Sequence, residues 1–287
     1  MGAGWIPMVM EPRVEDDYSS RQVEAARRVI VDVMQVLASF EDCLVLVGGW
    51  VPDLVIEDSE ELHVGSVDVD LALDVEKLNE GRYAEMLKLL IDTRRYQQGE
   101  KDFQFVTEVD LNDGEDPIQV DVDFLAPKDV TTEKNNPKLI ENFRVLKAEG
   151  CQAAFSSPLT INLDGEMISG ATNSVSLRVA SIPDFLIMKS FALNGRDKPK
   201  DGYDICYCLD FYDGGIEELA AAWKNRSKND KDVVRAVTIL KEKFKSVDSY
   251  GPMQVVSFHD STSKTIQREQ ARRAFELVKQ FISLVES

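Results

Sequence analysis

The stretches LVLVGGW (residues 44–50) and GSVDVDLAL (residues 65–73) decide the fold of this chain. Both contain apolar runs of strand length, and the first run ends in two glycines. Side chains alternate between the faces of a strand, so Asp68 and Asp70 point to one face while the apolar residues around them point to the other. Two carboxylates on one face repel each other unless a cation lies between them, and Mg²⁺ prefers such hard oxygen ligands. The spacing therefore predicts a strand that carries two metal ligands.

Composition excludes several classes of protein. Of the 287 residues 44% are hydrophobic, and no apolar run approaches the roughly 20 residues that a membrane-spanning helix needs. The N-terminus lacks the basic flank and long apolar stretch of a secretory signal. Four scattered cysteines and two histidines argue against a disulfide framework, a zinc site and catalysis by histidine. We expect a soluble, cytoplasmic protein with no membrane partner.

The net charge of −18 is uneven, because residues 1–125 carry −19 and residues 126–287 carry +1. An acidic surface is a poor partner for a polyanion. Any contact with nucleic acid should therefore come from the second half, where basic residues cluster at 189–200 and 224–245. Such charge runs are usually only solvated helix faces, and that interpretation stays open.

Hydrophobic periodicity predicts a mixed first part. Helices are expected over 21–40, with Ser19 or Ser20 as N-cap, and over 80–91. Strands are expected over 44–47, 67–73, 103–111, 117–125, around 159–163 and 175–179. Turns are predicted at Asn112-Asp113-Gly114 and Asp164-Gly165. The stretch 51–64 has little periodicity, and 127–142 is expected to be a surface loop.

After Pro183 the pattern becomes helical. Helices are predicted over 183–194, 202–212, 216–226, 231–246 and 264–284. The last has the clearest apolar stripe, formed by Ile266, Ala271, Ala274, Phe275, Val278, Phe281, Ile282 and Val285. The predicted fold class is α+β, with a mixed β-sheet domain and flanking helices over residues 1–180 and a helical domain over residues 181–287.

A third acidic strand completes a set of carboxylates. In IQVDVDFLAP (118–127) Asp121 and Asp123 share one face, opposite to the apolar residues. Transfer of a nucleotidyl group needs carboxylates that hold two metal ions and backbone amides that approach phosphates closely, for which glycine is suited. Asp68, Asp70 and one of the two later aspartates supply the carboxylates, and Gly48-Gly49 supplies the amides.

Together these residues resemble a known group. Gly48-Gly49, then Ser66-x-Asp68-x-Asp70 and a later Asp in an alternating strand are similar to the signature of polymerase-β-like nucleotidyltransferases. Downstream, IPDFLIMKSFALNGRDKPKDGYDI (182–205) resembles the helical motif of the AbiEii/MenT toxin branch. The matching positions are Lys189, Ala192, Arg196, Lys200-Asp201 and Asp204. The resemblance covers about residues 40–210.

The resemblance implies an enzyme that transfers NMP from an NTP to an acceptor hydroxyl with Mg²⁺, or Mn²⁺, as cofactor. It implies metal ligation by Asp68, Asp70 and Asp123, with Asp121 as the alternative third carboxylate. The residues that it places at the nucleotide are Gly48, Gly49, Ser66, Lys189, Arg196, Asp201 and Asp204. In the toxin branch the acceptor would be a tRNA 3′ end, and an antitoxin would be a partner.

Two alternatives remain open. The same chemistry could act on a small molecule or a protein hydroxyl, which suits the acidic first half better than RNA does. The chain could also be a catalytically inactive nucleotide-binding or interaction module, in which Trp50, where the family usually has Ser or Thr, and the stretch 51–64 would form an interface. Trp50 could equally stack on a base or lie in the core, and the latter is the more frequent outcome.

Overall fold

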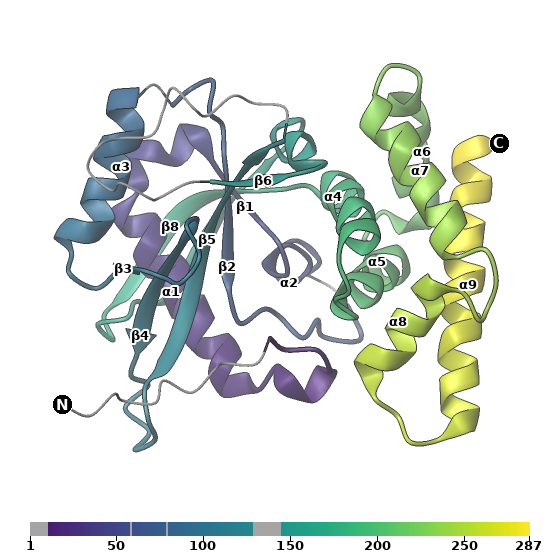
Figure 1. The fold of residues 1–287 in the computed structure, drawn as a ribbon, viewed down its shortest axis with the longest axis horizontal. Helices are drawn as coiled ribbons and strands as arrows, with labels where there is room; N and C mark the ends of the chain where they lie inside the picture. Colours follow the sequence, from purple (N-terminus) through teal and green to yellow (C-terminus); the bar gives the residue numbers. More distant parts are fainter. Residues whose placement is uncertain (1–10, 58, 79, 129–144) are drawn as a thin grey trace.

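The computed structural model describes residues 11–57, 59–78, 80–128 and 145–287. Within them an eight-stranded mixed sheet is flanked by helices and followed by a group of helices (Figure 1). The strand order is β3-β4-β5-β2-β1-β8-β7, with β6 paired to β5. The predicted α+β class is confirmed. Most of the predicted loop 127–142 lies outside the described residues.

The strands of this sheet are β1 (Leu44–Val47), β2 (Val69–Leu73), β3 (Gln97–Gln98), β4 (Gln104–Val109), β5 (Ile118–Pro127), β6 (Leu146–Ala148), β7 (Leu159–Glu166) and β8 (Thr172–Val179). The helices are α1 (Ser20–Val36), α2 (Trp50–Val55), α3 (Glu80–Asp92), α4 (Ile182–Gly195), α5 (Lys200–Phe211), α6 (Gly215–Ser227), α7 (Lys231–Lys243), α8 (Tyr250–His259) and α9 (Lys264–Glu286). Strand β2 lies between antiparallel β1 and parallel β5, and this arrangement positions the acidic residues.

Helix α1 begins where its capping signal predicts. Ser19 accepts a hydrogen bond from the Gln22 backbone N–H, and the Gln22 side chain reaches back to the Ser19 backbone, which forms a capping box. The helix ends at Val36 and a 3₁₀ helix (Ala38–Cys43) follows, so the predicted end at residue 40 was too late. Its buried face packs against the sheet.

One predicted turn was wrong, and two helices were not predicted. The stretch 51–64 begins with α2, which starts directly after the two glycines and packs against β1 and α4. Asp164 and Gly165 lie inside β7, and the hairpin to β8 turns at 167–171, where Gly170 has a φ of 80°. Helix α8 was not predicted, because its first turn contains Gly251 and Pro252. Proline is tolerated there, since the first N–H groups of a helix have no intrahelical partner.

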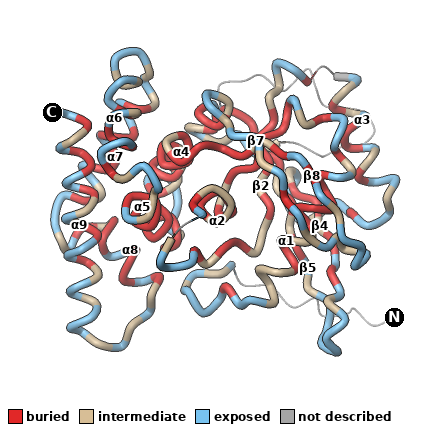
Figure 2. The backbone as a smooth tube through the Cα atoms, turned by 180° about the vertical axis from the view of Figure 1, so that it is seen from behind, coloured by how far each residue is buried: buried red, intermediate tan, exposed pale blue. Residues whose placement is uncertain are grey.

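The group of helices α4–α9 packs beside the sheet, with α4 and α5 nearest to it (Figure 1). Helix α9 buries one face against its neighbours (Figure 2). Most of the predicted stripe lies on that face, although Ile266 is exposed. None of the helices in the described ranges is both long and apolar enough to cross a membrane. Helix α4 begins beside the predicted boundary at 180/181, and the division into two domains stays a prediction.

Candidate active site

Strand pairing brings two of the three predicted carboxylates opposite each other. Asp70 on β2 and Asp123 on β5 are direct partners in the parallel register. Asp68 lies just before β2, so the predicted strand start at residue 67 was two residues early. The Ser66 hydroxyl donates to Asp68 Oδ1 at 2.6 Å. Asp68, Asp70 and Asp123 therefore lie on neighbouring backbone segments of the sheet.

The negative charges of these carboxylates repel one another. Burial, together with the charges of Asp68 and Asp123, raises the pKa of Asp70 to about 7. Burial is also the largest cause that raises the pKa of Asp123 to about 6. Burial acts in the same direction on Asp68, but Lys198, the Ser66 hydroxyl, Lys200 and Lys189 together outweigh it and leave the pKa of Asp68 lowered. The site thus carries more negative charge than its surroundings compensate.

Asp121 occupies a different position from Asp123. Its register partner on β4 is Val106, and it lies two residues along β5 from the position opposite Asp70. The buried Gln104 side chain donates to both aspartates, at 2.8 Å to Asp121 Oδ2 and 3.1 Å to Asp123 Oδ1. This register favours Asp123 as the third carboxylate, and Gln104 as the group that orients it.

Both glycines after β1 lie against site side chains. Gly48 has a φ of +73°, and a Cβ there would come within 1.9 Å of Asp70 Oδ2. A Cβ on Gly49 would come within 2.7 Å of Ser66 Oγ and 2.9 Å of Lys200 Nζ. A left-handed backbone and close approach both favour glycine. The absence of side chains lets the carboxylate strand lie directly against this turn.

Trp50 lies in the core. Its side chain is buried, and its indole N–H donates to the Asp68 backbone carbonyl at 2.8 Å. Stacking on a nucleotide base from this position is therefore not available to it. Instead, Trp50 fixes the backbone that carries Asp68.

The charged residues of the helical motif form one network. The Lys189 ammonium lies 2.8 Å from Asp201 Oδ1 and 2.7 Å from Asp204 Oδ2. Arg196 donates two hydrogen bonds to Asp201, each of 2.8 Å, and Lys200 lies 2.7 Å from Asp204 Oδ1. Only Arg196 exposes about half of its side chain (52%), while the other four are buried. The buried ion pairs compensate one another and fix α4 against α5.

Two residues near this network were not predicted from the sequence as site residues. Lys198, in the loop between α4 and α5, places its ammonium 4.0 Å from Asp68 Oδ2. Its signal was the basic run RDKPK (196–200), in which no spacing distinguishes it from Lys200. His63 is fully buried and lies 3.0 Å from Asp204 Oδ1 through Nε2. A lone histidine in an irregular stretch gave no signal.

The donor set fits a divalent cation in its chemistry. It consists of hard carboxylate oxygens. Burial, together with the charges of Asp68 and Asp123, raises the pKa of Asp70, and a bound cation would offset the cost of ionising it. Over the described ranges, no three His, Cys, Asp or Glu side chains stand in an arrangement that could hold a metal ion. The metal site therefore stays a prediction based on donor type and charge.

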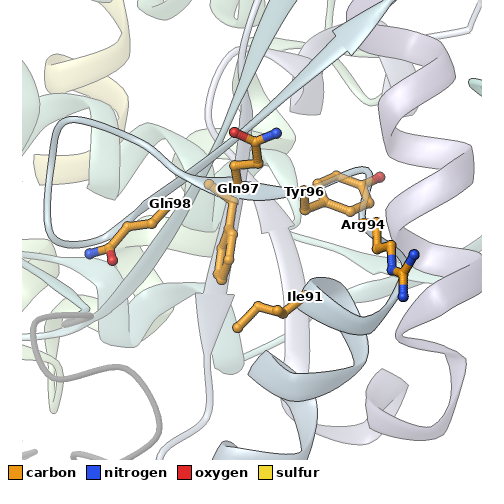
Figure 3. Close-up of a pocket in the computed structure, with 6 residues that line it drawn as sticks. Ile91, Arg94, Tyr96, Gln97 and Gln98 are labelled. Atoms are coloured by element: carbon orange, nitrogen blue, oxygen red, sulfur yellow. The ribbon is translucent and has the colours of Figure 1, made fainter.

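A separate pocket of about 400 Å³ lies at the β3 edge of the sheet (Figure 3). It is lined by Ile91, Arg94, Tyr96, Gln97, Gln98 and Phe105. Phe105 follows Gln104 on β4 and so points to the face opposite to Asp123. This pocket is therefore not part of the carboxylate site.

The histidine in the network is neutral. Burial and the charge of Lys200 lower the pKa of His63 to about 4, although Asp204 acts in the other direction. In the unfolded protein His63 has a pKa near 6.5, so it becomes protonated at a higher pH than in the native protein. Acidification below pH 6.5 therefore stabilises the unfolded state relative to the native state. The stability that His63 confers is therefore lost as the pH falls below 6.5.

This difference gives a pH-dependent prediction. The advantage of the wild type over His63→Gln in free energy of unfolding should shrink by about 2 kcal/mol between pH 7 and pH 5, because glutamine does not titrate. Urea unfolding of both proteins at the two pH values measures it. A difference that is independent of pH would contradict a buried neutral histidine.

A match to a family model agrees with the resemblance. The family model described as nucleotidyl transferase AbiEii toxin, type IV TA system, matches residues 33–284. No curated protein matches the chain. The crystal structure of JHP933 from Helicobacter pylori is similar at 14% identity and a TM-score of 0.43, over 93% of this chain and 94% of that one.

An antigenic nucleotidyltransferase-like protein from Paracoccidioides brasiliensis is similar at 17% identity and a TM-score of 0.36, over 77% of this chain and 94% of that one. The family model spans most of the chain, including the two glycines, all the acidic strands and the helical motif. This chain belongs to the AbiEii family of nucleotidyl transferase toxins of type IV toxin–antitoxin systems.

Proposed function

We propose that this toxin transfers NMP from an NTP to an acceptor hydroxyl at the site formed by Asp68, Asp70 and Asp123. The acceptor oxygen bonds to the α-phosphorus, the bond from that phosphorus to the bridging α–β oxygen breaks, and pyrophosphate leaves. The observation that carries the proposal is the register of β2 and β5, which sets Asp70 opposite Asp123.

The side chains have distinct roles in this proposal. Mg²⁺ or Mn²⁺ held by the three aspartates would offset the charge of the triphosphate and make the acceptor hydroxyl more acidic. Asp123, which lies opposite Asp70, is assigned to take the proton of that hydroxyl. Gln104 holds the Asp123 carboxylate in place. The backbone amides of Gly48 and Gly49 are assigned to the phosphates, and the Ser66 hydroxyl, which donates to Asp68, is assigned to orienting that carboxylate.

The cations divide into two groups. Arg196 exposes half of its side chain, and Lys198 already lies beside Asp68, so these two are assigned to the triphosphate. The Lys189 ammonium is buried against Asp201 and Asp204. We assign Lys189 and these two aspartates to holding the loop at 196–199 against the site.

Lys198→Ala is expected to raise KM for the NTP about tenfold, because a hydrogen bond to a charged phosphate contributes about 1.5–3 kcal/mol. Steady-state kinetics of NMP transfer measure the change. Lys241→Ala is the matched control, since Lys241 is exposed on α7 and pairs with Glu286. An unchanged KM in Lys198→Ala would remove this residue from the triphosphate site.

For the acceptor we propose the 3′ end of tRNA. The toxin family and the basic residues of the second half support this choice. The charge of −19 on residues 1–125 instead favours a small molecule or protein as acceptor. An antitoxin is the partner that the family implies.

Incubation with each α-labelled NTP, Mg²⁺ or Mn²⁺ and total tRNA tests the acceptor, with Asp68→Ala as control. Label in tRNA that depends on Asp68 supports the proposal. Label in a small molecule or a protein would show that tRNA is not the acceptor, while the proposed nucleotidyl transfer would stand. NTP binding without any transfer, measured by calorimetry, would indicate an inactive binding module and would contradict the proposed function.

A further inference from the structure

His63 connects the segment before Ser66 to helix α5 through both of its ring nitrogens. Nδ1 accepts a hydrogen bond from the Gly65 backbone N–H at 3.1 Å. Nε2 lies 3.0 Å from Asp204 Oδ1, and an ionised carboxylate can only accept. The neutral ring therefore carries its proton on Nε2, which donates to Asp204. Each nitrogen has one role, and neither is left without a partner.

Aromatic packing fixes the orientation of this ring. The imidazole stacks on Tyr203, with ring centroids 5.4 Å apart and planes 25° apart. It meets the edge of Tyr207 at 4.8 Å. The Tyr207 hydroxyl in turn donates to the Glu61 carbonyl at 2.8 Å. Helix α5 thus holds the segment 61–65 at several points.

The backbone between His63 and Ser66 has little room to move. Gly65 has a φ of +72°, and a Cβ there would come within 2.7 Å of Val23 on α1. The residue whose N–H His63 binds is therefore held in a left-handed turn against α1. Ser66, which follows directly, donates to Asp68. The orientation of His63 is thereby transmitted over a few bonds to the carboxylate.

We propose that His63 is a positioning residue that sets Ser66 and Asp68 relative to Asp204 and Lys200 of α5. Its ring nitrogens contact Gly65 and Asp204, not the three aspartates assigned to the metal. This proposal rests on the proposed function at one point, which is the assignment of Asp68 as a metal ligand. The network of Lys189, Asp204 and Lys200 supplies a fixed acceptor for its Nε2–H, so both anchoring points are rigid.

Three substitutions separate the two hydrogen bonds from packing. His63→Phe keeps an aromatic ring between Tyr203 and Tyr207 but loses both bonds. His63→Gln offers an amide N–H at the distance of Nε2, and His63→Asn offers an acceptor near the position of Nδ1. His259→Phe is the matched control, because this second histidine lies at the end of α8, is partly exposed and bonds Glu15. Each protein is first checked for cooperative unfolding.

Mn²⁺ binding, measured by calorimetry, reports the placement of Asp68 without turnover. His63→Phe is expected to weaken Mn²⁺ binding about tenfold, at the lower end of the effect of residues that orient metal ligands. His63→Gln or His63→Asn should restore part of the affinity, and His259→Phe should match the wild type. Wild-type affinity in His63→Phe, or equal losses in all three His63 variants, would overturn the positioning role.

The tautomer provides a second readout in the metal-free protein. Histidine ¹⁵N spectra at pH 7 should show one ring in the neutral form with the proton on Nε2, and this signal should be lost in His63→Gln. A proton on Nδ1 would overturn the proposal. Should the wild type bind Mn²⁺ but transfer no NMP, the proposed function would fail while these two readouts still decide the role of His63.

Discussion

Asp70→Asn is expected to reduce NMP transfer at least 1,000-fold and, at the same time, to stabilise the metal-free protein. The loss of activity follows because removing a carboxylate from the proposed metal site forgoes several kcal/mol of transition-state stabilisation. The gain in stability follows because burial, together with repulsion from the charges of Asp68 and Asp123, raises the pKa of Asp70 to about 7. An amide of the same shape removes this repulsion.

The expected stabilisation is about 2 kcal/mol at pH 8 with EDTA present. A carboxyl whose folded-state pKa is raised destabilises the native state increasingly as the pH rises from the unfolded-state pKa to that raised value. The gain should therefore shrink as the pH falls from 8 to 5. Urea unfolding gives the stability and labelled-NTP transfer gives the activity. A variant that loses both activity and stability would indicate an ordinary structural carboxylate.

Gly48→Ala is expected to lower the free energy of unfolding by about 3 kcal/mol and NMP transfer at least 100-fold. The left-handed conformation costs an alanine about 1–2 kcal/mol, and its Cβ would lie 1.9 Å from Asp70 Oδ2. Asp70 must then move, and a displacement of about 1 Å at a reacting centre is sufficient for such a loss of rate. Thermal or urea unfolding and transfer kinetics measure the two effects.

Gly114→Ala is the matched control for this variant. Gly114 lies in the β4–β5 hairpin with a φ of +87°, and a Cβ added there would meet nothing within 4 Å. It should therefore show the backbone cost alone, about 1–2 kcal/mol, with transfer unchanged. If Gly48→Ala proved no more harmful than Gly114→Ala, the contact between this turn and Asp70 would be unimportant.

Local pattern predicted most of the elements. Strand β1 has the predicted bounds, and α1 begins after Ser19, because a continuous apolar run that ends in glycines, a period of 3.6 residues and an N-cap serine are local signals. The elements that were missed or misplaced also have causes in the local sequence. Helix α2 is only six residues long and follows Gly-Gly, and α8 contains Gly-Pro in its first turn. Gly165 suggested a turn, but sheet pairing keeps it in β7.

The candidate site was only partly predictable for a different reason. Alternation places Asp68, Asp70, Asp121 and Asp123 on polar faces, but strand register decides that Asp123 and not Asp121 is opposite Asp70. Gln104 and Lys198 reach the site from a strand and a loop that are distant in sequence from Asp68, and His63 is linked to Asp204, which is 141 residues away. Their contacts depend on tertiary packing, for which a single sequence has no periodic signal.

The central claim is that Asp68, Asp70 and Asp123 jointly hold the divalent cation. Crystals of the wild type grown with Mn²⁺ and a non-hydrolysable NTP analogue test it through the anomalous signal of manganese. The account predicts a peak about 2.1–2.2 Å from carboxylate oxygens of all three aspartates, and its loss in Asp70→Asn. Manganese bound elsewhere, with these carboxylates free of it, would contradict the account.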